Sequence, residues 1–223
     1  MANAGIPVPR TVVVTGGVPN EVPRFGNLMV LKKVAQDSSG GNGVVLVRHD
    51  RVRQKLAELV RDAKWQYPIL IQEFIRTGRS AATTRIATFM GNPILTWTST
   101  LVEPLPEEGQ ADEVLEKTNI ASNRPGLPKQ RSFDLDPAKV ALARRVFDVF
   151  RNIPLHGVDV VTGHDGRHYV LEMNGGGNTW HFSSDGGPRI RATQGGRAGM
   201  IAQMGAWRIV ADTLIERTRL EAQ

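Results

Sequence analysis

Three oxygen-bearing side chains late in the chain have the types and spacing of a divalent-cation site. Asp159 interrupts the apolar run 158–161, and Glu172 and Asn174 lie two residues apart in a second apolar segment. Residues two apart on a strand share a face, so pairing of the two segments across Gly163 would bring the three side chains together. Carboxylate and carboxamide oxygens suit Mg²⁺. The alternative is a polar outer sheet face, but acids in apolar strands are costly unless paired or metal-bound, which favours the metal.

A glycine-rich loop at residues 38–43 follows two lysines, Lys32 and Lys33. Glycines let successive backbone N–H groups turn toward phosphate oxygens, and a lysine adds a point charge for the same oxygens. The loop lacks the Gly-Lys-Ser/Thr ending of a Walker sequence, and a strand follows it instead of a helix. A hairpin turn with solvated lysines is the alternative interpretation.

Two polar residues and an aromatic interrupt the apolar segment Ile71-Gln-Glu-Phe-Ile75. Such a segment could pair its backbone with the edge of a nucleotide base while apolar side chains sandwich the ring. An edge strand with a solvent-facing Gln72 or Glu73 explains the same pattern. A set of cations and amides, Arg85, Asn119, Asn123 and Arg124, could neutralise a phosphate or an acyl phosphate.

The elements that must position these residues alternate along the chain. We expect strands at residues 11–15, 28–32, 44–47, 69–75, 85–90, 94–101, 157–161 and 168–173. Asp50 is the expected N-cap of a first helix, Asp136 followed by Pro137 opens a second, and a third is expected over about 199–220. Residues 103–130 carry four prolines and no clear period, which predicts a long loop. The break at 76–79 divides a smaller lobe, 1–76, from a larger lobe, 77–223.

Composition narrows the class of protein. The 223 residues carry 28 Lys and Arg against 22 Asp and Glu, a net charge of +6 that suits an anionic partner. No cysteine is present, which excludes disulfides and thiolate chemistry. No apolar run approaches the roughly 20 residues of a membrane helix, and no secretory leader opens the chain. A cytoplasmic protein without membrane contact is therefore expected.

Taken in order, these segments resemble the ATP-grasp superfamily, and within it the ribosomal-protein glutamate ligases and glutathione synthetase. The resemblance covers about residues 5–183 in the family's own order. It rests on four segments: Gly5 to Thr11, Leu31-Lys-Lys33 with Ser39-Gly-Gly-Asn-Gly-Val44, Gln72-Glu-Phe-Ile75, and His156-Gly-Val-Asp159 followed by Val170-Leu-Glu-Met-Asn174. It implies an α+β fold, with two lobes built on antiparallel sheets and the nucleotide site between them.

The resemblance also implies roles for individual residues. Lys32 or Lys33 would hold the α and β phosphates of ATP, and Arg124 with Arg85 would stabilise the transferring phosphoryl group. Mg²⁺, with Mn²⁺ as an alternative, would bind to the acid and amide set described first. The remaining nucleotide contacts would be Ser39, Gly40, Gly41 and Gly43 over the phosphates, and Gln72, Glu73, Phe74 and Ile75 at the adenine. The implied reaction is phosphorylation of a carboxylate, of a small molecule or peptide, and attack on the acyl phosphate by an amine, thiol or other nucleophile.

Two departures from the family bear on the substrate. The family has a preceding α/β domain that this sequence does not contain, so we expect either a fragment or a short form, with a separate N-terminal domain or a homo-oligomer as partner. The metal segment is followed by Gly175-Gly-Gly-Asn-Thr-Trp-His-Phe-Ser183 instead of a proline-containing segment. Asn178, Trp180 and His181 should therefore alter acceptor specificity, although a hydrogen-bonded loop residue explains His181 equally well.

Two other classes compete with the ligase. One is an ATP- and Mg²⁺-binding module without catalysis. The other is a nucleic-acid-binding protein, which only the net charge suggests. Trp and Tyr total six and do not alternate with Lys or Arg along any strand, so no stacking platform for bases is expected.

Overall fold

The computed structural model describes residues 1–34, 43–62, 64–121, 126–176, 180–183 and 187–222. The strands are β1 (Thr11–Val14), β2 (Leu28–Lys33), β3 (Val44–Arg48), β4 (Ile69–Glu73), β5 (Ser80–Phe89), β6 (Asn92–Pro104), β7 (Lys129–Ser132), β8 (Leu155–Thr162) and β9 (His168–Gly175). The α-helices are α1 (Val52–Arg61), α2 (Asp112–Lys117), α3 (Pro137–Val149), α4 (Pro188–Thr193), α5 (Gly196–Met204) and α6 (Ala206–Glu221). The predicted α+β class with antiparallel sheets is confirmed.

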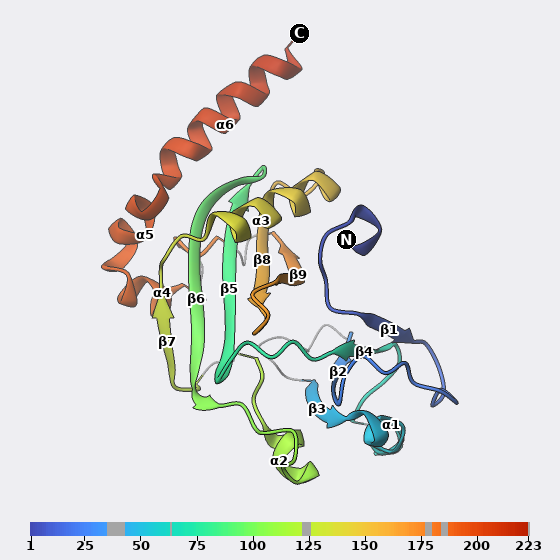
Figure 1. Ribbon diagram of the computed structural model, residues 1–223. Coiled ribbons are helices and arrows are strands. Elements are labelled where there is room, and N and C mark those ends of the chain that lie inside the picture. The colour runs from blue at the N-terminus through green and yellow to red at the C-terminus, as the bar shows by residue number, and fades with distance from the viewer. Residues whose placement is uncertain (35–42, 63, 122–125, 177–179, 184–186, 223) are drawn as a thin grey trace.

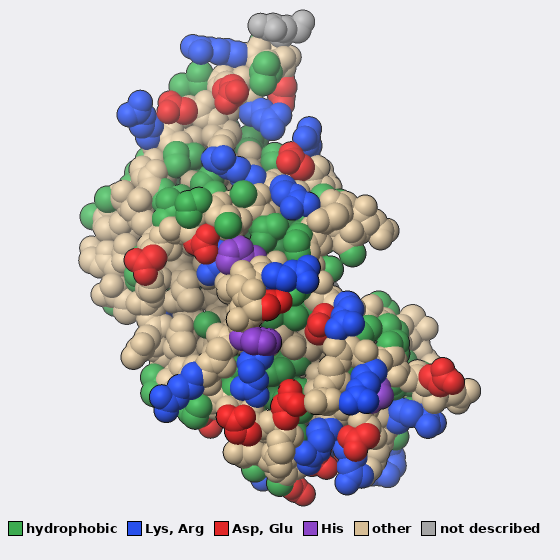
Figure 2. Space-filling model, in the orientation of Figure 1, with side chains coloured by type: hydrophobic (Ala, Val, Ile, Leu, Met, Phe, Trp, Pro, Cys, Tyr) green, Lys and Arg blue, Asp and Glu red, His purple; other side chains and the backbone are tan. Residues whose placement is uncertain are grey.

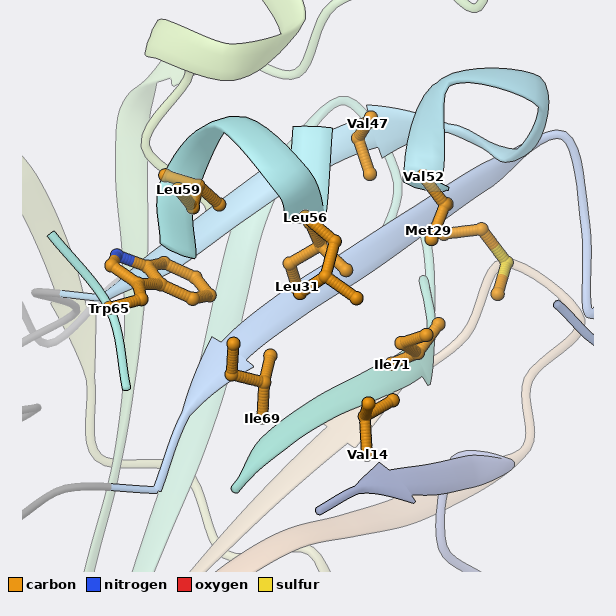
Figure 3. Packing of buried hydrophobic residues seen from close by; sticks show 10 residues of the cluster. All are labelled: Val14, Met29, Leu31, Val47, Val52, Leu56, Leu59, Trp65, Ile69 and Ile71. Carbon is orange, nitrogen blue, oxygen red and sulfur yellow. The ribbon is translucent and has the colours of Figure 1, made fainter. Parts of the chain in front are cut away.

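The smaller sheet has the strand order β1-β4-β2-β3, and every neighbouring pair is antiparallel. Helix α1 covers one face because its apolar side chains recur at helical spacing and meet alternate residues of the strands. Figure 3 shows Leu56 over Leu31 and Ile69, with Trp65 closing one side. Each fully buried aliphatic side chain of this kind contributes about 1.5–3 kcal/mol.

The larger sheet has the order β7-β6-β5-β8-β9, again antiparallel throughout. One face is covered by α3, whose Leu142, Ala143 and Val146 pack on Ile86 and Val158. The predicted cap of this helix is confirmed, since the Asp136 carboxylate accepts hydrogen bonds from the backbone N–H groups at 138 and 139. Figure 1 shows α3 crossing β6, β5 and β8 near the upper end of the sheet in that view.

The second face of the larger sheet is covered only in part. At one end α4, α5 and α6 pack on alternate residues of β5 and β6, including Ala87 and Leu95. Helix α6 then runs away from the body to the C-terminus (Figure 1). Charged side chains of both signs are interspersed over the lower lobe on the face shown in Figure 2. Beyond these helices, Lys32 of the smaller lobe reaches the same face, where it pairs with Glu172 of β9.

Each lobe packs against a segment of chain that neighbours the other lobe in sequence. Helix α2 and Ile120 lie between β6 and β7 in sequence but pack on the open face of the smaller sheet, against Leu28, Val30 and Leu46. In the other direction, Ile6 packs into the core under α3. Among the described residues, no helix is long and apolar enough to cross a membrane.

Three details of the predicted elements were wrong. Asp50 lies in a short 3₁₀ turn, and α1 begins after Arg51 without a side-chain cap. The stretch 103–130 is not a continuous loop, because it contains α2 and the start of β7. The expected helix at 199–220 is interrupted at Gly205, which adopts φ 66° between α5 and α6, a backbone conformation that glycine adopts without a Cβ clash.

Candidate active site between the lobes

A row of charged residues crosses three neighbouring strands on the face of the larger sheet opposite α3. Arg85 of β5 is the register partner of Asp159 of β8, which is in turn the partner of Glu172 of β9. The predicted pairing of the two strands across Gly163 is therefore confirmed, with Asp159 and Glu172 directly opposite. A bulge follows the pair, since the next register partners are Val160 and Val170. The extra residue of the bulge brings Val170 back to the core face.

Asp159 is almost completely buried, with 4% of its surface exposed. The Arg85 guanidinium binds both carboxylate oxygens: Nε donates to Oδ1, and Nη2 donates to Oδ2 at 2.6 Å. Burial raises the pKa of Asp159 to about 6, with the cation of Arg85 opposing the rise and the nearby charge of Glu172 adding to it. The site therefore holds a carboxylate whose ionised form depends on nearby positive charge.

Glu172 joins the two lobes. Its Oε2 accepts from the Lys32 ammonium of the smaller lobe at 3.1 Å, and its Oε1 accepts from the Asn174 amide at 3.3 Å. Burial raises the pKa of Glu172, but the charge of Lys32 and the hydrogen bond from the Asn174 amide outweigh it, so the pKa of Glu172 lies below its ordinary value. Glu172 is thus an ionised carboxylate beside a second, more deeply buried one.

The donor set of the row fits Mg²⁺. Two carboxylates and a carboxamide lie side by side, and one or two carboxylates with phosphates are what Mg²⁺ ordinarily binds. Among the described residues, no group of three or more His, Cys, Asp or Glu side chains could hold a metal. An ion here would therefore be incompletely coordinated by protein side chains, as a site shared with phosphates requires.

The residues predicted to hold phosphates fall in two groups. Lys32 points to the row, whereas Lys33 lies on the alternate side of β2, so the register of the two lysines favours Lys32 as the cation at the site. Gly43 has φ 79°, and a Cβ at this position would come within 2.6 Å of the Lys33 side chain, so the backbone there requires glycine. Ser39, Gly40, Gly41 and Arg124 lie outside the described residues.

The segment predicted to hold adenine lines a cavity. Glu73, Phe74 and Ile75 border a space of about 210 Å³ between the lobes, together with Leu28 of β2 and Tyr169 of β9. Three of the predicted nucleotide contacts thus line one cavity. Lys32, which reaches the charged row, lies three residues along β2 from Met29, the register partner of Glu73.

Two side chains of this segment already have protein partners. The Glu73 carboxylate forms an ion pair with Arg10 at 2.7 Å, and Arg10 holds its pKa below the ordinary value more strongly than burial raises it. Gln72 donates to the Thr11 hydroxyl of β1. Contacts from this segment to a ligand would therefore come mainly from backbone groups and from the side chains of Phe74 and Ile75.

His181 lies near Arg85 of the row, in surroundings that the sequence did not predict. Only 8% of its surface is exposed, and its ring stands edge-on to Trp97, the register partner of Arg85, with 4.8 Å between ring centroids. Neither ring nitrogen has a hydrogen-bond partner within the described part of the chain, so the expectation of a hydrogen-bonded loop residue was wrong. Burial, with the cations Arg85 and Arg191, lowers the pKa of His181 to about 4. The ring is neutral at pH 7.

Comparison with known proteins identifies the fold and no close relative. No family model matches the sequence, and no curated protein matches it. Solved structures do match. The ATP-grasp ligase PsnB complexed with a minimal precursor aligns with a TM-score of 0.51 and 16% identity, covering 91% of this chain and 58% of that protein.

Two further structures agree. A RimK domain protein ATP-grasp from Sphaerobacter thermophilus gives a TM-score of 0.53 at 22% identity over 91% of this chain and 63% of its own. D-alanine–D-alanine ligase from Bacillus anthracis gives 0.53 at 17% identity over 95% and 66%. The chain therefore has the fold of these proteins, and it spans about three fifths of the length of the first of them.

Proposed function

We propose that this chain, which has the ATP-grasp fold, binds ATP between its lobes and uses it to phosphorylate a substrate carboxylate. A carboxylate oxygen attacks the γ-phosphorus, the bond to ADP breaks, and an acyl phosphate forms. An amine or another nucleophile then attacks the acyl carbon, and phosphate leaves. The observation that carries the proposal is the row Lys32, Glu172, Asp159 and Arg85, which joins the two lobes beside an inter-lobe cavity.

The geometry suits one elongated ligand with a base at one end and phosphates at the other. We place the base in the cavity beside Glu73, Phe74 and Ile75. Met29 is the register partner of Glu73, and Lys32 follows three residues later, about 10 Å along the strand. The Lys32 ammonium, now on Glu172, would donate to phosphate oxygens at that end.

Asp159, Glu172 and Asn174 would hold Mg²⁺, which when bound neutralises charge on the phosphates. Arg85 keeps Asp159 ionised and fixes its orientation through two hydrogen bonds, and we assign it this positioning role. Phosphoryl transfer needs placement and charge neutralisation more than covalent help from the protein. His181 lies next to Arg85 as a neutral ring, which suits a contact with the acceptor substrate.

The proposal is tested by measuring ADP release with ATP, Mg²⁺ and a panel of carboxylates, and by trapping the acyl phosphate with hydroxylamine as a hydroxamate. Glu172→Gln removes a negative charge and little volume, so it should abolish ADP release and leave the melting temperature close to that of the parent. Glu216→Gln, on the exposed part of α6, is the matched control and should keep full activity. Equal rates for Glu172→Gln and the parent would show that the acid is not part of the reacting centre.

A second candidate is a nucleotide-binding module without catalysis. The observation in its favour is that the chain spans only 58% of the length of the PsnB ligase, so part of an acceptor site could belong to another chain or domain. Tight binding of ATP with Mg²⁺, combined with no ADP release for any carboxylate of the panel, would favour this candidate.

A further inference from the structure

Each carboxylate of the row already has a protein cation as its counter-ion. Arg85 donates to both oxygens of Asp159, and the Lys32 ammonium lies 3.1 Å from Oε2 of Glu172. Two cations therefore balance two carboxylates, and the four residues of the row carry no net charge at pH 7. A divalent ion that approaches this neutral set gains little attraction from it until one of the two cations leaves.

The fold holds the two cations with different firmness. Arg85 and Asp159 belong to adjacent strands of one sheet, and their side chains are only 15% and 6% exposed. Lys32 comes from the other lobe, and its flexible four-carbon chain reaches Glu172, whose side chain is 38% exposed. Lys32 is therefore the counter-ion that can leave, whereas Arg85 stays with Asp159.

Lys32 lies on an oxygen that a metal ion would use. Oε1 of Glu172 accepts from the Asn174 amide, and Oε2 accepts from Lys32. Mg²⁺ binds carboxylate oxygens at about 2.1 Å, so an ion on Oε2 would lie within about 5 Å of the ammonium. At about 5 Å the repulsion between a double and a single positive charge corresponds to about tenfold in affinity, even in water. The ammonium and the ion therefore compete for one side chain.

We propose that Lys32 is an internal counter-ion that weakens the binding of divalent cations to Glu172 until the phosphates of a nucleotide take over its ammonium. Nucleotide and metal then bind with positive cooperativity, because the residue that opposes the metal becomes a partner of the phosphates. The coupling is reciprocal, so the metal strengthens nucleotide binding by the same factor. The inference rests on the metal and phosphate assignments of the proposed function and adds the linkage between them.

Transfer of Lys32 changes the charge around the metal side chains. With its ammonium on the phosphates, the two carboxylates Asp159 and Glu172 face one guanidinium, that of Arg85, which leaves one negative charge. Oε2 of Glu172 is then open to a new partner. Carboxylate oxygens in negative excess, next to phosphate oxygens, are the ligand combination that Mg²⁺ ordinarily takes.

A plain link between the lobes is the competing explanation of this ion pair. Side chains that are 22% and 38% exposed form a pair that contributes little to stability. If Lys32 were only a link, its loss would leave the affinity for a metal ion unchanged. If Lys32 is a counter-ion, its loss changes two affinities in opposite directions, since metal binds more tightly and nucleotide more weakly. A folding defect would weaken both, so it cannot produce opposite signs.

The test measures Mn²⁺ binding to the full chain by electron paramagnetic resonance, without nucleotide and at about 20 mM salt, where charges are weakly screened. Lys32→Met removes the charge and keeps the length of the side chain, so it should bind Mn²⁺ at least fivefold more tightly than the parent. Lys32→Gln, which keeps a polar group, should show the same gain. Lys64→Met is the matched control, because Lys64 pairs with Asp62 at 3.0 Å and is exposed, and it should stay within twofold.

Equilibrium dialysis with the non-hydrolysable nucleotide AMPPNP completes the cycle. In EDTA, Lys32→Met should bind AMPPNP about tenfold more weakly than the parent. Saturating Mn²⁺ should strengthen AMPPNP binding by a factor that is at least fivefold larger in the parent than in Lys32→Met. Formation of the Mn²⁺–AMPPNP complex in solution is the same for both proteins and cancels from this ratio. Equal factors, or equal Mn²⁺ affinities of the two proteins without nucleotide, would overturn the proposal.

Glu172→Gln distinguishes failure of this proposal from failure of the proposed function. If Glu172→Gln binds Mn²⁺ as the parent does, the metal assignment is wrong and the counter-ion role is refuted with it. Loss of Mn²⁺ binding in Glu172→Gln without a gain in Lys32→Met refutes the counter-ion role alone. The expected gain in Lys32→Met, combined with no ADP release for any carboxylate, supports the counter-ion role and refutes only the catalytic part of the proposed function.

Discussion

Removing His181 should change how the stability of the fold depends on pH. The pKa of this ring falls from 6.5 to about 4 on folding, because the ring is buried beside Trp97 and near Arg85. The unfolded chain therefore binds a proton at a pH where the folded chain does not. The stability that the neutral ring supports is complete above pH about 6.5 and is lost as the pH falls toward about 4. Between pH 7 and pH 4.5 the loss amounts to about 2 kcal/mol.

A nearby acid works in the opposite direction. The pKa of Asp159 is raised to about 6, so this group adds stability as the pH falls through about 6. The parent protein alone would show only the sum of the two effects. The informative quantity is the difference in unfolding free energy between the parent and His181→Gln, which keeps a polar side chain but does not titrate.

Urea unfolding of both proteins in EDTA, at pH 7 and at pH 4.5, gives this difference. The parent should lose about 2 kcal/mol more than His181→Gln over the interval. His164→Gln removes an exposed histidine and is the matched control, expected to change the unfolding free energy by less than about 0.5 kcal/mol at either pH. A parent-to-variant difference that stays constant with pH would refute the burial of a neutral ring at this position.

Three further substitutions test other parts of the structure. Lys32→Ala should weaken ATP binding about tenfold in a calorimetric titration, because a charge-assisted hydrogen bond at the row is lost, while Lys33→Ala should stay within about twofold; equal losses would contradict the assignment of Lys32 to the site. Asp136→Ala should lower the free energy of unfolding by about 1 kcal/mol, since two backbone N–H groups of α3 lose their acceptor, and an unchanged urea midpoint would argue against this cap. Gly205→Ala should cost about 1 kcal/mol in the same assay, because a Cβ is strained at φ 66°, and a more stable variant would show that α5 and α6 can join.

The sequence predicted that Asp159 and Glu172 would lie side by side because two strong local signals met there. Acids inside apolar strands mark positions that need a partner, and a turn at Gly163 between two strands leaves antiparallel pairing as the simplest arrangement. The structure adds the direct opposition of Asp159 and Glu172 and the grip of Arg85, which depend on strand order. The position of β5 beside β8 joins residues far apart in the chain, and no local pattern encodes it.

Other features of the structure could not be predicted from the sequence, each for a physical reason. Helix α2 has six residues, too short for an amphipathic period, and it is stabilised by packing on β3 of the other lobe. The surroundings of His181 come from distant elements, since its ring lies against Trp97 of β6 and its carbonyl accepts from Arg191 of α4. The pKa of Lys129 is lowered by burial and by the charges of Arg131 on β7 and Arg189 on α4, which lie near it only in the folded chain. Each of these features depends on contacts between elements far apart in the sequence, and local secondary-structure propensity does not encode such contacts.

The way the chain passes between the lobes has a mechanical consequence. The N-terminal segment lies on the larger lobe, where Pro7 accepts a hydrogen bond from the N–H of Val170, and it then enters the smaller sheet at Thr11. The chain leaves the smaller sheet again after Glu73, at the end of β4. Because Arg10 forms an ion pair with Glu73, the segment that enters the smaller lobe and the segment that leaves it lie side by side.

These two segments lie side by side, so a swing of the smaller lobe, with α2 packed on it, would take place about the line through them. Displacement then grows with distance from that line. Lys32 lies about 10 Å along β2 from Met29, the register partner of Glu73. A swing of about 10° would therefore move Lys32 by nearly 2 Å, whereas the cavity wall next to Glu73 would hardly move. A base seated next to Glu73 would stay in place while the bond between Lys32 and Glu172 opens and recloses.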